Sequence, residues 1–221
     1  MNTSNEIKFT LDGLEARLML HGGPHGGFGG GFGGDRGGHG GAGGCHGGGG
    51  LGIYMPATPN ATVTADLAAI QADKAALEAD VQALSTADKT TLKADKQAIR
   101  TAIQALSSAL TTTKATLESD ENVWQAKIKT DQTTLATDTK NGVSTTADLK
   151  QLATDQLAGL KAVTADKQAI AAIITADTSV ATAQSKLTAD LPTIAAAQAK
   201  LKADMATLIT DVEAQLAAAS A

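Results

Sequence analysis

The side chains best suited to metal chemistry gather in one glycine-rich stretch of the chain. His25, His39, Cys45 and His46 all lie within residues 21–52, which also hold 20 of the 23 glycines. Imidazole and thiolate groups are good ligands for Zn, Cu or Ni, so these four residues are the candidate metal ligands. Polyglycine supplies neither fixed geometry nor a supporting hydrogen-bond shell, and ordering it costs more than about 1 kcal/mol per residue. The sequence therefore favours no bound cofactor, with metal binding by this tract as the alternative.

The remainder of the chain lacks the residue types that a catalytic site needs. Beyond residue 52 there is neither histidine nor cysteine, and carboxylates recur at helical spacings that a solvated helix face explains. Nothing forms a set of nucleophile, base and orienting group. The glycine tract does not follow a strand and has no Gly-Lys-Ser/Thr, so it is not a phosphate-binding loop. The sequence predicts that this is not an enzyme.

Composition narrows the class of protein further. Aromatic residues make up only 2% of the 221 residues, and the net charge is −5 with lysines and aspartates interspersed. Without a basic patch or an aromatic platform, nucleic acid is excluded as a partner. A single cysteine permits no intramolecular disulfide. No apolar run approaches the roughly 20 residues of a membrane-spanning helix.

Apolar periodicity predicts that residues 62–221 are helical. Leucine, isoleucine and valine recur at alternating spacings of three and four, the a/d pattern of a coiled coil. The pattern covers four segments and includes a few polar positions at Lys74, Lys96, Asp131 and Lys167. An Ala-Asp step also recurs along these segments, mostly at spacings of seven or eleven, which indicates repeat expansion of an amphipathic unit or convergence of a simple composition. We predict an all-α fold: an antiparallel, alanine-rich coiled coil or four-helix bundle.

Turn and capping signals divide this body into four predicted helices. Ser85-Thr86-Ala87-Asp88 has the form of a capping box, Asn141-Gly142 is a turn signal, and Pro192 fits a first helical position or kinks a helix that has already begun. The predicted helices are 64–84, 86–139 with a bend at 119–122, 145–181 and 188–217. The second and third form a long central hairpin, and the outer two fold back beside its base.

The N-terminal residues resemble a short signature of known proteins. Leu14, Glu15, Arg17 and Leu20 match the Leu-Glu-Pro-Arg-x-Leu-Leu pattern found near the start of large, often repetitive proteins of planctomycetes and related bacteria. Met19 stands for the first of the paired leucines, and alanine stands for the proline. The resemblance covers about ten residues and implies an exported or cell-surface protein. A short amphipathic or unstructured start in a cytoplasmic protein is the alternative.

These observations predict three zones: a tag-like segment at 1–20, a disordered Gly/His-rich tract and linker at 21–61, and the helical domain at 62–221. The predicted function is that of a structural or scaffolding protein, which acts as a spacer or as an interaction module for protein partners. Self-association through the helices is an open possibility, because the apolar seam is thin. The alternatives are a metal-binding protein and a lipid- or surface-associated amphipathic coat.

Overall fold

A computed structural model describes residues 51–221 of the chain. A short 3-10 turn, η2 (Leu51–Tyr54), is followed by six α-helices and by no strand within these residues. Helices occupy 91% of this part, so the all-α prediction is confirmed. The helices are α3 (Ala61–Ala83), α4 (Thr86–Ala105), α5 (Ser107–Asn141), α6 (Thr146–Ala176), α7 (Thr178–Asp190) and α8 (Pro192–Ser220).

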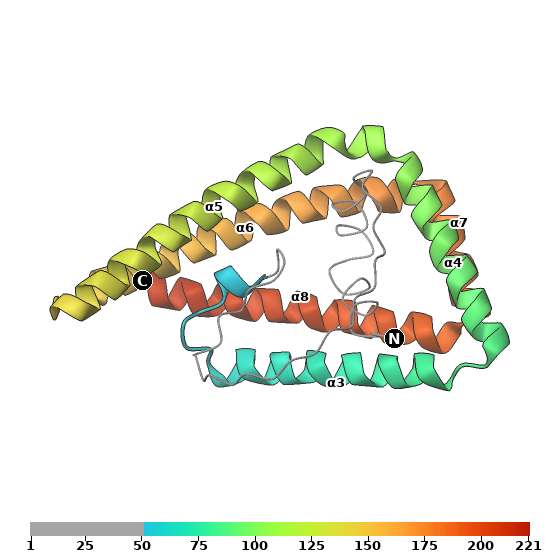
Figure 1. The fold of residues 1–221 in the computed structure, drawn as a ribbon, viewed down its shortest axis with the longest axis horizontal. Coiled ribbons are helices and arrows are strands. Elements are labelled where there is room, and N and C mark those ends of the chain that lie inside the picture. Colours follow the sequence, from blue (N-terminus) through green and yellow to red (C-terminus); the bar gives the residue numbers. More distant parts are fainter. Residues whose placement is uncertain (1–50) are drawn as a thin grey trace, which may run out of the picture.

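The helices pack in pairs that form the three sides of a triangle (Figure 1). The chain runs outward along α3, α4 and α5, turns at residue 142, and returns along α6, α7 and α8. As a result α5 packs on α6, α4 on α7, and α3 on α8. The fold is one long helical hairpin that is bent twice. It is closed where α8 packs against α6, and the hairpin tip projects beyond that corner.

This arrangement differs from the predicted four-helix base with a two-helix stalk. The structure has six helices in the described part, because the predicted second helix breaks at Leu106 and the predicted third helix ends at Ala176. At 119–122, where a bend is predicted, α5 continues without a break. Leu117 and Ile128 are buried on either side of them, so packing outweighs the weaker helix propensity of serine and asparagine. The coiled-coil form of the packing stays a prediction.

The three turn signals read from the sequence do end or begin helices. The Ser85 hydroxyl caps α4 by accepting from the Asp88 N–H at 3.1 Å, and it donates to the Asp88 carboxylate at 2.8 Å. Pro192 is the first residue of α8, where the missing N–H costs no helical bond. Gly142 has the left-handed φ of 69°, and Val143 N–H donates to Asp138 C=O at 2.9 Å, which closes α5 in a Schellman motif.

Most of the buried side chains belong to the predicted apolar seam, although two of the three on α7, Val180 and Ala183, do not. Leu110, Leu117, Leu160 and Ile174 are fully buried at 0% exposure. Leu149 lies three residues before the buried Leu152, at the spacing of the seam, but it is 47% exposed near the hairpin tip. Each helix therefore contributes only a narrow row of core residues. In the part of the chain that the structure describes, no helix is long and apolar enough to cross a bilayer.

The bend between α6 and α7, which is not among the predicted turns, has a side-chain cap that can be tested. At the break between α6 and α7, the Asp177 carboxylate accepts from Ser179 N–H at 2.9 Å and from Val180 N–H at 3.0 Å. We expect Asp177→Ala to lower the free energy of unfolding by about 1 kcal/mol, because two N–H groups at the start of α7 lose their acceptor. Urea unfolding followed by circular dichroism measures the change.

The control for the cap is Ser179→Ala. This substitution keeps the backbone N–H that donates to Asp177 and removes an exposed hydroxyl. An equal loss of stability in the two variants would contradict the assigned role of the Asp177 carboxylate.

Candidate functional site

The predicted metal ligands and the N-terminal signature lie outside the described residues. Metal binding and export therefore stay predictions. The residues concerned are His25, His39, Cys45 and His46 for the metal, and Leu14, Glu15, Arg17, Met19 and Leu20 for the signature. Within residues 51–221, no three His, Cys, Asp or Glu side chains converge in a way that could hold a metal ion.

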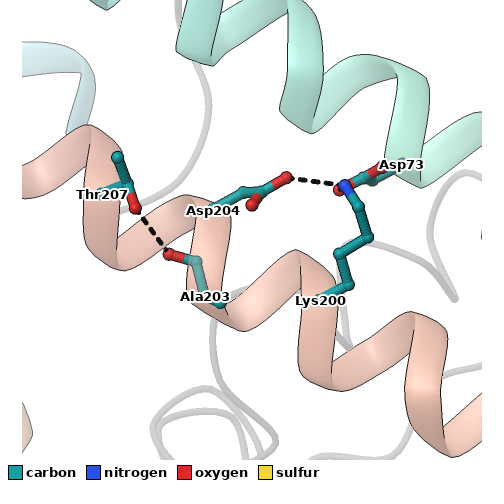
Figure 2. A network of polar contacts seen from close by, with 5 residues as sticks. All are labelled: Asp73, Lys200, Ala203, Asp204 and Thr207. Atoms are coloured by element: carbon teal, nitrogen blue, oxygen red, sulfur yellow. Dashed lines mark hydrogen bonds and ion pairs between the residues drawn. The ribbon is translucent and has the colours of Figure 1, made fainter.

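The polar groups that the fold does bring together are lysines and aspartates on facing helices. Between α3 and α8, Lys200 reaches across to Asp73 and also contacts Asp204, one turn along its own helix, at 3.0 Å (Figure 2). The hydrogen bonds to Asp73 and Asp204 raise the pKa of Lys200 above its ordinary value. One lysine thus joins two carboxylates across the α3–α8 side.

Each of the other two sides of the triangle also has a lysine that contacts an aspartate of the facing helix. Between α4 and α7, Lys186 contacts Asp95 at 2.6 Å across the interface and Asp190 on its own helix. Between α5 and α6, Lys127 contacts Asp155 at 2.6 Å, and Asp131 lies one turn after Lys127. We call these three groupings the lysine bridges. Each consists of a Lys-x-x-x-Asp sequence on one helix and an aspartate on the partner helix.

The lysine bridges fix the register of each helix pair more than they stabilise it. Exposed ion pairs of this kind are worth about 0.2–1 kcal/mol. The carboxylates of Asp95 and Asp155 are only 1% and 2% exposed, however. A shift of register would leave these buried charges without their lysine, and an unpaired buried charge is costly. Gln151 adds a second donor to Asp155 at 2.9 Å, and the bonds from Lys127 and Gln151 hold the pKa of Asp155 below its ordinary value against the opposing effect of burial.

Three further pairs of aspartates face each other without a lysine between them. They are Asp66 with Asp211, Asp120 with Asp166, and Asp138 with Asp148. One oxygen each of Asp66, Asp148 and Asp166 is buried without a hydrogen-bond partner. Loss of hydration, and then the facing carboxyl, raises the pKa of Asp66, Asp148 and Asp166 above the ordinary 3.8. A proton on one member turns two opposed acceptors into a donor and an acceptor.

Tyr54 and Trp124, the two aromatic residues of the described part of the chain, meet at a glycine. A Cβ atom on Gly159 of α6 would lie 2.8 Å from Tyr54 Cε1 and 2.9 Å from Trp124 Cγ, so only glycine lets both rings approach the helix this closely. Lys127 lies over the Trp124 ring at 5.1 Å. Tyr54 is 3% exposed and its hydroxyl has no partner. Burial, and then the nearby carboxylates of Glu121 and Asp120, raise the pKa of Tyr54 to about 12.

Residues 53–60, which we call the strap, are bound to both α6 and α8. The buried Gln156 side chain of α6 donates to the carbonyls of Ile53 at 3.0 Å and Met55 at 2.9 Å. Gln215 of α8 donates to the Thr58 carbonyl at 2.7 Å and accepts from the Asn60 N–H at 3.0 Å. The sequence indicated a proline-marked linker here, but these residues form specific contacts with the body.

Sequence reasoning found the recurring aspartates but not their partners. The Ala-Asp repeat includes Asp73, Asp95, Asp190 and Asp204 but not Asp131 or Asp155, which follow threonine. A lysine four residues earlier marks the three aspartates that lie on the same helix as the lysine of their bridge. Which aspartates meet follows from the register of helices that are far apart in the sequence. Gly159 carries a signal of its own, since a glycine within a helical pattern often marks a close approach of another group.

Comparison with protein-family models, with curated proteins and with solved structures gives no match for this chain.

Proposed function

We propose that this chain is a non-enzymatic structural or scaffolding protein whose helical body acts as a spacer of fixed dimensions. The observation that carries this proposal is the repetition of the same lysine bridge on all three sides of the triangle. A frame whose three sides each hold one register keeps the distances between its corners constant. Constant distance is the property that a spacer or scaffold supplies to the partners it carries.

The N-terminal signature supports placing this spacer outside the cell or on its surface. In that arrangement residues 1–20 are the part of the chain that is recognised, and the helical body is the part that is displayed. Cell fractionation with an antibody against the helical body tests the location, and recovery in the cytoplasmic fraction alone would contradict it.

Small-angle X-ray scattering, light scattering and circular dichroism of the full chain test the spacer directly. We expect strong helicity and a scattering profile with the dimensions of the closed triangle, whether the chain is a monomer or a symmetric oligomer. Weak helicity, or a profile of a collapsed or extended body, would contradict a spacer of fixed dimensions.

A second proposal concerns the glycine tract, where His25, His39, Cys45 and His46 offer nitrogen and sulfur ligands. Calorimetry with Zn²⁺ separates it from the first, by comparing the full chain with a variant that lacks residues 22–52. Binding by the full chain alone supports a metal-handling role for the tract, and equal binding by both excludes it.

A further inference from the structure

The closed corner of the triangle depends on two sets of contacts. The first is the packing of α8 against α6, and the second is the strap that spans the same two helices. Figure 1 shows η2 lying beside this corner, from which the chain passes to the start of α3. The strap is therefore the segment that joins residues 1–50 to the helical frame.

The strap is held by contacts of unequal strength. Gln156 is 3% exposed, so its two bonds to backbone carbonyls form in a region shielded from water, where they are strong. The bonds between Gln215 and the strap lie at the surface, where water competes for the same groups. The Tyr54 hydroxyl is buried without a partner, which opposes docking of the ring because a buried unsatisfied polar group carries a free-energy cost.

These contacts make the strap separable from the helices. Its withdrawal as far as Pro59 breaks no hydrogen bond of α3, because Asn60 is the residue of the strap that caps this helix. It would let Tyr54 regain water while uncovering Gly159 and one side of Trp124.

We propose that residues 53–60 are a releasable strap that keeps the α6–α8 corner closed, and that withdrawing it from Gln156 and Gly159 opens the triangle at this corner. The N-terminal part of the chain is thereby coupled to the shape of the frame. The inference rests on the contacts of the strap and does not require the scaffolding role.

The single tyrosine and the single tryptophan allow the release to be followed in the full chain. The test variant is Gly159→Ala, whose Cβ displaces the Tyr54 ring while alanine favours the helix. The matched control is Gly52→Ala, because a Cβ at Gly52 meets nothing within 4 Å. We expect the pKa of Tyr54, read from tyrosinate absorbance, to fall from about 12 toward 10.0 in Gly159→Ala only.

Opening of the corner is measured by electron–electron double resonance between two spin labels, with Cys45→Ser in every variant. Thr146→Cys and Ala219→Cys place exposed labels on α6 and α8. Ala98→Cys and Ala181→Cys, on α4 and α7, form the control pair. We expect a longer distance component between α6 and α8 in Gly159→Ala, with the α4–α7 distance and the helicity unchanged.

An unchanged α6–α8 distance would overturn the proposal, whether or not the pKa of Tyr54 falls, because the strap would then be a passive cover. If Gly159→Ala also disturbs the α4–α7 pair or the helicity, Gln215→Ala decides. This substitution removes only the surface bonds to Thr58 and Asn60, which hold the strap to α8. If the α6–α8 distance is unchanged in that variant as well, the strap does not keep the corner closed. Scattering from the unmodified chain tests the spacer separately, so the two proposals can fail independently.

Discussion

Lowering the pH from about 7 to about 4 is expected to raise the melting temperature of the helical body. The folded protein raises the pKa of Asp66, Asp148 and Asp166 above 3.8, so it binds their protons more tightly than the unfolded chain does. The stabilisation from these protons is fully present below the unfolded pKa and is lost as the pH rises through the folded values. Acidification within this window therefore favours the folded state.

The lysine bridges set the lower limit of this window. The pKa of Asp155 and Asp204 is below the ordinary value in the folded protein, mainly because both accept hydrogen bonds. Their contribution is present above the unfolded pKa and is lost as the pH falls through their folded values. We therefore expect stability to pass through a maximum near the ordinary carboxyl pKa and to fall again in stronger acid.

Thermal unfolding followed by circular dichroism at a series of pH values measures this profile. The triple variant Asp66→Asn, Asp148→Asn and Asp166→Asn should have a higher melting temperature than the native chain at neutral pH and a flatter dependence between pH 7 and about pH 4. Asp73→Asn is the contrasting control. It removes the negative charge of one of the two carboxylates that Lys200 contacts and should lower the melting temperature at neutral pH. A native chain whose stability falls steadily from neutral pH into acid would contradict the assigned carboxyl pairs.

Truncation of Leu160 to alanine is expected to remove a large share of the folding stability. Leu160 is 0% exposed on α6, and deleting a fully buried leucine side chain costs about 3–5 kcal/mol in transfer free energy and residual cavity. Native domains are stable by only about 5–15 kcal/mol. The core here is a narrow row of side chains, so few neighbours are available to collapse into the space.

Leu149→Ala is the matched control, because it makes the same chemical change on the same helix at a site that is 47% exposed. We expect a loss of less than about 1 kcal/mol there. Urea unfolding gives the free energy of unfolding of each variant, with the same dependence of that free energy on urea concentration assumed for both. Similar losses at the two sites would mean that the buried row on α6 is not the core of the protein.

Much of the local structure could be predicted from the sequence because its causes are local. Leucine and isoleucine at spacings of three and four lie on one face of a helix wherever that helix packs, and most of the buried residues follow that seam. The ends of helices at Ser85, Gly142 and Pro192 depend on a hydroxyl cap, a left-handed φ and a missing N–H. Each of these effects acts within one turn of chain, so the residues themselves determine it.

The shape of the molecule and its polar contacts were decided only by the tertiary structure. No signal comparable to Pro192 or Asn141-Gly142 marks the bend at Leu106, which has no side-chain cap. The partners of Lys200, Lys186 and Lys127 depend on the register between helices that lie far apart in the sequence, and a small slip would exchange them. The sequence alone shows that the helical body has no histidine and no cysteine. Which of its polar side chains meet one another is decided by how the helices pack. The same is true of Gly159. The sequence shows a glycine in a helix, and only the fold brings Tyr54, from about 100 residues earlier, and Trp124 of the neighbouring helix α5 against it.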